Sequence, residues 1–281
     1  MPRLKVMTLN VWGYRGNWPA RRERLIELMQ EEEIDVLLLQ EVAERPWRPN
    51  QAMELAMITG YMCAYVPCQR YLPWVSYSSG LAVLSRFPIS NQIATEISPS
   101  AGLFAFNDHR RRMCQRVEAA MDGMSVVLYN TNFPLTPTER DFAVHRLWGQ
   151  VRQEEAVLVV VGGSFNAQPE ETPILFLQGK IPLEGMRGAL VDAWITAGIG
   201  PAETFPSDAP SRRIDYVFYQ AEPSVIVQET KVIGRYPIPL SDHNAVVATF
   251  SISPTRDMML PIGEEPVGSL EPTGGGKFGG Y

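Results

Sequence analysis

The sequence predicts an α/β fold, and three observations carry that prediction. The segments LKVMTLNV (4–11) and IDVLLLQE (34–41) are almost continuously apolar, as expected of buried strands. Between them, the segment 19–33 places Leu25, Ile26 and Met29 on one helical face and its charges on the other. A strand, a helix and a second strand in this order are typical of α/β architecture.

Strands dominate the rest of the chain. A helix is expected at 49–60, ending at Gly60, and strands at 61–67, 80–87, 114–121 and 125–133. Asp122-Gly123 suits a type I′ turn, so the last two of these strands should form a hairpin. A helix at 138–151, a buried strand at 156–163 and two short helices lead to final strands at 213–219, 224–233 and 244–252.

The composition changes near Ser253. Residues 253–281 are rich in Pro and Gly and poor in core-forming side chains, so they cannot bury enough surface to offset their ordering entropy. We predict one domain over 1–252 and a disordered tail over 253–281.

Charge and cysteine content narrow the function classes. The net charge is −6, a poor match for a protein that binds nucleic acid through nonspecific phosphate contacts. Three cysteines without metal-type spacing indicate idle thiols in a reducing compartment. No apolar run approaches the roughly 20 residues that span a bilayer, and the first residues do not resemble a signal peptide. We therefore expect a cytoplasmic protein without a membrane span.

Acidic and amide side chains recur at the ends of the predicted strands. They are Asn10, Glu41, Asn166, Asp215 and the pair Asp242-His243. Each alone has a structural explanation, because Asn and Asp side chains bond to turn backbone. As a set they indicate a site, since carboxylate and amide oxygens suit hard cations such as Mg²⁺. Three scattered histidines without paired cysteines argue against zinc. The Asp242-His243 pair must lie in a turn to act together, because adjacent strand residues face opposite ways.

Seven motifs then resemble, in order and spacing, those of the endonuclease/exonuclease/phosphatase (deoxyribonuclease I-like) superfamily. They are TLNVWG, LLLQEV, GLAVLSRFPI, YNTNF, VVGGSFNAQP, RRIDYVF and LSDHNAV. The resemblance covers residues 4–250. It implies a four-layer sandwich, in which two mixed β-sheets pack face to face between helices. It also implies a Mg²⁺- or Mn²⁺-dependent attack of water on a phosphoester.

The resemblance further implies a role for each matched residue. Glu41 resembles the principal metal ligand, and Asn10 its neighbour. Asn166 resembles the amide that holds the phosphate or the attacking water. Asp242 resembles a second metal-side carboxylate or the group that orients His243, which resembles the histidine that stabilises charge on the phosphoryl group. Asp215 resembles the structural and catalytic aspartate of the R-I-D-Y/H segment.

Two positions depart from the pattern of this family. Ser164 stands in Gly-Ser-Phe-Asn where the family has Gly-Asp-Phe/Leu-Asn, and a hydroxyl is a poor base near neutral pH. Asn132 stands in Asn-Thr-Asn where the family has Asn-Thr-His, and an amide can neither carry positive charge nor transfer a proton. Loss of the base costs about 10²–10⁴-fold, and loss of the donor about 10²–10³-fold. These two departures indicate either a relaxed function or a deliberate inactivation. A third interpretation is altered chemistry with Ser164 as the nucleophile, although no base neighbours it in sequence.

Two function classes remain open. The first is a metal-dependent phosphodiesterase or phosphatase of weakened activity; the acidic chain favours a phosphorylated small molecule or phosphodiester over long nucleic acid. The second is an inactive binding module on the same fold that holds a phosphorylated ligand. Trp74 and Tyr77, in an aromatic segment, either grip a base, sugar or lipid headgroup or pack over the sheet. The sequence does not indicate the oligomeric state.

Overall fold

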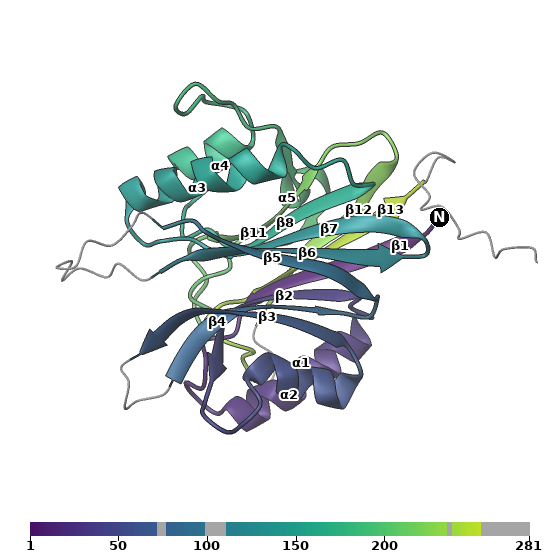
Figure 1. Ribbon diagram of the computed structural model, residues 1–281, viewed down its shortest axis with the longest axis vertical. Coiled ribbons are helices and arrows are strands. Elements are labelled where there is room, and N and C mark those ends of the chain that lie inside the picture. The colour runs from purple at the N-terminus through teal and green to yellow at the C-terminus, as the bar shows by residue number, and fades with distance from the viewer. Residues whose placement is uncertain (72–76, 99–110, 235–237, 254–281) are drawn as a thin grey trace, which may run out of the picture.

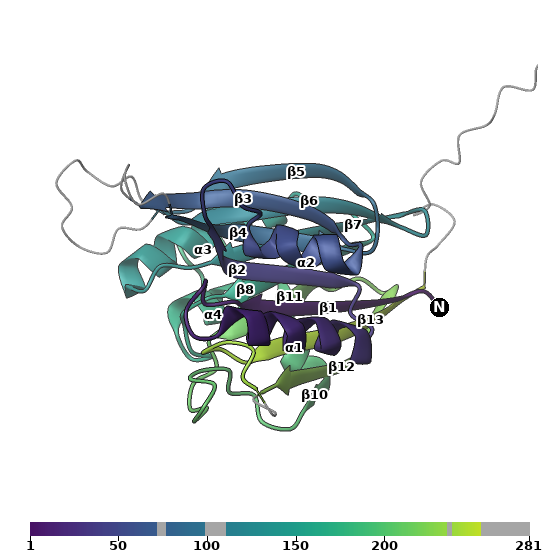
Figure 2. The ribbon, with the colours of Figure 1, turned by 90° about the horizontal axis from the view of Figure 1, so that it is seen from below.

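Two β-sheets pack face to face with helices on both outer sides, as Figures 1 and 2 show. The computed structural model describes residues 1–71, 77–98, 111–234 and 238–253. This arrangement confirms the predicted four-layer sandwich of two mixed sheets. Within the described ranges, no helix is both long enough and apolar enough to cross a bilayer.

The first sheet has seven strands in the order β10-β12-β13-β1-β2-β4-β3. Its strands are β1 (Arg3–Asn10), β2 (Val36–Glu44), β3 (Met62–Tyr71), β4 (Tyr77–Ser85), β10 (Gly198–Ile199), β12 (Val225–Ile233) and β13 (Ala245–Ile252). β1 pairs parallel with β2 and antiparallel with β13.

The second sheet has six strands in the order β5-β6-β7-β8-β11-β9. Its strands are β5 (Ile89–Glu96), β6 (Met113–Met121), β7 (Met124–Asn132), β8 (Leu158–Ser164), β9 (Leu190–Asp192) and β11 (Asp215–Gln220). β6 and β7 form the predicted hairpin, with Met121 opposite Met124 across Asp122-Gly123. Both turn residues have positive φ, 50° and 80°, as a type I′ turn requires.

Helices cover the outer face of each sheet. α1 (Trp18–Glu31) and α2 (Gln51–Thr59) lie on the seven-stranded sheet, and α3 (Pro137–Val151) and α4 (Thr172–Leu177) on the six-stranded sheet, while α5 (Ala193–Ala197) follows β9. Local chemistry sets their ends. The side chains of Asn17 and Asn50 cap α1 and α2 by accepting from backbone N–H groups, and Gly60 ends α2 at φ 78°.

Strand alternation divides the core into three layers. Alternate residues such as Leu4 and Val6 on β1 and Val160 on β8 fill the space between the sheets. The intervening residues, such as Leu9, pack under α1 and α2, or under α3 and α4 in the case of Val161. The continuous apolar runs of the sequence therefore reflect strands that are covered on both faces.

Three strands were not predicted. β5 carries few buried side chains and forms the edge of its sheet, so it lacks the apolar pattern by which a strand is recognised. β9 and β10 have three and two residues. The disordered tail was predicted over 253–281, and all of it except Ser253 lies outside the described residues. The three thiols are free, and burial raises the pKa of Cys63 to about 11.

Candidate active site

The inter-sheet layer changes from apolar to polar at one end of the sandwich. On β1, the alternation that buries Leu4 and Val6 continues with Thr8 and Asn10. On β8, the same face passes from Val160 through Gly162 to Ser164. Because β1/β2 and β7/β8 are parallel pairs, the carboxyl ends of four strands meet at this end.

Strand register gathers three of the predicted residues on the six-stranded sheet. Asn132 at the end of β7 lies opposite Ser164 at the end of β8. Ser164 in turn lies opposite Asp215, the first residue of β11. All three are buried, and all three lie on the face that looks toward the other sheet.

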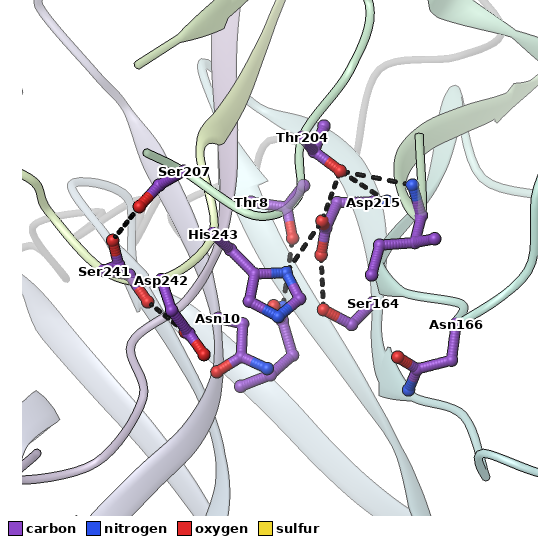
Figure 3. A network of polar contacts seen from close by, with 12 residues as sticks. Thr8, Asn10, Ser164, Asn166, Thr204, Ser207, Asp215, Ser241, Asp242 and His243 are labelled. Carbon is purple, nitrogen blue, oxygen red and sulfur yellow. Dashed lines mark hydrogen bonds and ion pairs between the residues drawn. The ribbon is translucent and has the colours of Figure 1, made fainter. Parts of the chain in front are cut away.

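Asp215 is the centre of the polar network in Figure 3. Its Oδ1 accepts a hydrogen bond from the hydroxyl of Ser164, and its Oδ2 accepts one from Thr204 Oγ1 at 2.6 Å. Oδ2 also lies 2.9 Å from Nδ1 of His243. Sequence reasoning missed Thr204, because a threonine in a loop carries no signal of its own. No base neighbours Ser164 in sequence, but the fold brings Asp215 into contact with it. Ser164 is nevertheless only 1% exposed, which leaves a phosphoester little access to its hydroxyl.

His243 links the two sheets. It precedes β13 in the first sheet, and its contact with Asp215 crosses to the second. The ring of Phe205 lies 4.7 Å from the imidazole, centroid to centroid. Burial lowers the pKa of His243, but the charge and hydrogen bond of Asp215, with smaller contributions from Asp242 and Glu41, outweigh it and raise that pKa above its ordinary value. With Nδ1 engaged, Nε2 is the atom that His243 presents to a ligand (Figure 3).

The structure corrects the prediction that Glu41 ends its strand. β2 continues to Glu44, and the pairing with β4 shifts between Leu39 and Val42. Glu41 lies in this bulge with φ 54°, a conformation that costs a non-glycine residue roughly 1–2 kcal/mol. Bulges redirect a side chain out of the strand alternation. The bulge therefore lets a glutamate inside a buried strand keep its carboxylate partly exposed.

Asp242 lies in the bend before β13, as the prediction for the Asp242-His243 pair requires. Ser241 Oγ donates to its Oδ1 at 3.0 Å. Burial raises the pKa of Asp242, and the negative charge of Glu41 adds to that rise against the opposing charge of His243. The charge of Glu41 thus disfavours the charged form of Asp242.

Asn10 and these two carboxylates supply a donor set that fits a hard divalent cation. Asn10 also confirms the structural explanation for a strand-end asparagine, since its Oδ1 accepts from the backbone N–H of Trp12 at 3.0 Å. In the described residues there is no cluster of three or more His, Cys, Asp or Glu side chains that could ligate a metal. Mg²⁺ nevertheless usually keeps several waters and is bound through only one or two carboxylates, which this donor set supplies. A cation would also relieve the repulsion between Glu41 and Asp242.

Asn166 completes the candidate site from the loop after β8. Its Nδ2 donates to the carbonyl of Phe133 at 2.7 Å and to Oδ1 of Asn132 at 3.3 Å. Because a carbonyl can only accept, the amide nitrogen must face Phe133. Asn166 therefore turns its oxygen toward the site, where it can accept from water, and Asn132 keeps its nitrogen as a donor.

An amide network that the sequence did not reveal lies between the sheets beneath the site. Gln40 Nε2 donates to Thr8 Oγ1 at 3.0 Å and to Asn130 Oδ1 at 2.8 Å. Asn130 Nδ2 donates back to the carbonyls of Leu39 and Ala82, both at 3.0 Å. These bonds fix the separation of β2 and β7, and with it the separation of Glu41 from the second sheet.

The two predicted aromatic substrate-binding residues are not tested by the structure. Trp74 lies outside the described residues, and Tyr77 begins β4 without a described side chain, so their role stays a prediction. Near the site, Glu171 occupies the N-cap position of α4 without a capping hydrogen bond from its side chain, and it forms an ion pair with Arg140.

Comparisons with known proteins agree with this architecture. The profile of the Endonuclease/Exonuclease/phosphatase family matches residues 7–243. The inositol phosphosphingolipids phospholipase C of Schizosaccharomyces pombe is 23% identical over 308 residues, covering 89% of this chain and 69% of that protein.

Solved structures show the same fold at low identity. A family protein from Bacteroides vulgatus superposes with a TM-score of 0.73 at 17% identity, covering 90% of this chain and all of that one. Truncated TDP2 of Caenorhabditis elegans superposes with a TM-score of 0.65 at 21% identity, covering 89% of this chain and 97% of that one.

Proposed function

Because the chain belongs to the Endonuclease/Exonuclease/phosphatase family, we propose that it is a divalent-metal-dependent phosphoester hydrolase of weakened activity. The observation that carries the proposal is the hydrogen-bonded contact between His243 and Asp215. It joins the sheet that bears Asn10 and Glu41 to the sheet that bears Ser164, and so makes one site of residues far apart in sequence.

In this proposal Glu41, Asp242 and Asn10 hold Mg²⁺ or Mn²⁺, which would supply positive charge to the phosphoryl oxygens. His243 donates from Nε2 to a phosphoryl oxygen, while Asp215 fixes its ring and favours its protonated form. Asn166 accepts a hydrogen bond from the attacking water, and Asn132 donates to the phosphate. The hydroxyl of Ser164 donates to Asp215, so it does not deprotonate the water. We propose weak turnover because position 164 carries no group that can act as a base on the attacking water.

The proposed substrate is a small or lipid-linked phosphodiester. The net charge of −6 disfavours long nucleic acid, which is held through clustered cations. The name of the Schizosaccharomyces pombe relative points to a phospholipid substrate for that protein. We place the reaction in a reducing compartment such as the cytoplasm, with free thiols as support.

An inactive binding module is the second candidate, and one observation favours it. Ser164 is buried in a satisfied hydrogen bond, so the position is well packed without a base. Such a protein would bind a phosphorylated ligand at the same residues without cleaving it.

The deciding assay measures hydrolysis of bis(p-nitrophenyl) phosphate, a phosphosphingolipid and a short DNA, each with Mg²⁺ or Mn²⁺. The native chain is compared with the double variant Ser164→Asp/Asn132→His and with Glu41→Gln. Slow, Glu41-dependent turnover that rises by orders of magnitude in the double variant supports the proposed hydrolase. Ligand binding without turnover in either chain supports the binding module. Fast turnover by the native chain refutes both.

A further inference from the structure

An arginine lies against the carboxylate that the proposed function assigns to the cation. Arg15 Nη1 is 3.6 Å from Oε2 of Glu41, and the side chains are 60% and 28% exposed. A guanidinium and a divalent cation would compete for this carboxylate. An arginine in contact with Glu41 would also lie near a phosphoryl group that a cation held at that carboxylate.

The turn that carries Arg15, residues 12–16, is anchored by buried groups. Arg21, itself buried, donates from Nη2 to the carbonyls of Gly13 at 2.8 Å and Arg15 at 2.6 Å. Gln51 donates to the same Gly13 carbonyl at 2.8 Å. The backbone under Arg15 is thus fixed, while its side chain remains in contact with solvent.

Arg21 also ties this turn to the loop of His243. Its Nη1 donates to the carbonyl of Val11 at 2.8 Å and to that of Leu240 at 2.9 Å. One buried guanidinium therefore sets the position of the Arg15 turn relative to Asp242 and His243. Trp12 adopts φ 57°, a left-handed conformation that is unfavourable for a residue with a side chain, whereas Gly13 and Gly16 adopt φ 53° and 61° without that penalty.

We propose that Arg15 is a phosphate-binding residue that rests on Glu41 until a divalent cation engages that carboxylate. Arg15 then turns its planar donors to a phosphoryl oxygen, a geometry for which guanidinium is well suited. The proposal rests on the proposed function, because it assumes a cation at Glu41. It adds a cationic donor to a site in which position 132 is an amide.

Two binding measurements, made without turnover, test this idea on the full chain. The first titrates Mn²⁺ alone by calorimetry, and the second titrates dimethyl phosphate at saturating Mn²⁺. For Arg15→Gln we expect Mn²⁺ to bind about two- to fivefold more tightly, the usual strength of an exposed ion pair. We expect dimethyl phosphate to bind about tenfold more weakly, since a charge-assisted hydrogen bond is lost. Arg15→Lys should give intermediate values for both.

Arg152→Gln is the matched control, because it removes the same charge from an exposed residue at the end of α3. It should leave both affinities unchanged. Opposite shifts in Arg15→Gln, absent from the control, support the inference. Shifts in the same direction, or no shift, overturn it. Glu41→Gln distinguishes failure of the proposed function from failure of the Arg15 inference. If Mn²⁺ binds that variant as tightly as the native chain, the cation site of the proposed function is refuted, whatever the result for Arg15.

Discussion

The replacement Ser164→Asp is the sharpest test of the site. The hydroxyl of Ser164 is in direct hydrogen-bond contact with Asp215, so a carboxylate at position 164 would lie within about 4 Å of a second carboxylate. At that distance two like charges repel by about 4 kcal/mol at an effective dielectric constant of 20. This corresponds to a rise of about three pKa units in the pair. The variant should therefore carry a group that titrates near neutral pH, where a general base is most effective.

We expect kcat of Ser164→Asp with Mg²⁺ to exceed that of the native chain by about 10²–10⁴-fold at a pH of about 8. Because the carboxyl pKa is raised in the folded state, the variant loses stability as pH rises through that pKa. Without a cation the loss should reach at most about 4 kcal/mol. Urea denaturation measures this loss, and Mg²⁺ should recover part of it.

Ser164→Asn is the control, because it has nearly the volume of the aspartate and cannot act as a base. If Ser164→Asp and Ser164→Asn are folded and equally inactive with Mg²⁺, the assignment of position 164 to the missing base is refuted.

Three further predictions concern the network, the acid response and the core. In the Ser164→Asp background, Asp215→Asn should lower kcat by at least about tenfold. It should also lower the pKa of His243, because the imidazole loses its anionic partner. Kinetics and histidine NMR titration check these two effects, and an unchanged His243 pKa would contradict the prediction. Hydrogen bonds from Arg116 lower the pKa of Glu154, so this carboxylate stabilises the fold above its unfolded pKa near 4.3 and loses that contribution as pH falls. Glu154→Gln should therefore cost about 1–3 kcal/mol at neutral pH and less at a pH of about 3, as urea denaturation would show. Leu38→Ala, in the layer between the sheets, should cost about 2–5 kcal/mol by the same measurement, whereas a cost below about 1 kcal/mol would place Leu38 outside the packed core.

Apolar periodicity predicted most of the strands and helices because it reports burial directly, whereas the four-layer sandwich was predicted from the resemblance to the family. Asn10 and Asp215 were found for the same reason: each stands where an apolar pattern meets a polar residue at a strand end. Glu41 shows the limit of this reasoning. The apolar run before it suggested that the strand ended there, whereas a bulge carries the strand three residues further.

Residues that act through contacts between distant parts of the chain could not be recognised from the pattern of apolar and polar residues. Thr204 meets Asp215 because the loop between them folds back, and Arg21 reaches the carbonyl of Leu240 from the far end of the chain. Such contacts depend on loop paths, which local propensity does not determine. Nothing in the sequence distinguishes Arg15 from the other charged residues, and only the fold shows its contact with Glu41.

The candidate site is distributed over two sheets, and the two residues that differ from the family pattern lie on the same one. Asn132 ends β7 and Ser164 ends β8, so both belong to the six-stranded sheet. The proposed cation ligands come from the other sheet, from β1, from the bulge in β2 and from the bend before β13. Under the proposed function, changes at Asn132 and Ser164 therefore leave the proposed cation ligands on the other sheet in place, and we expect the protein to bind an ion even where its turnover is slow.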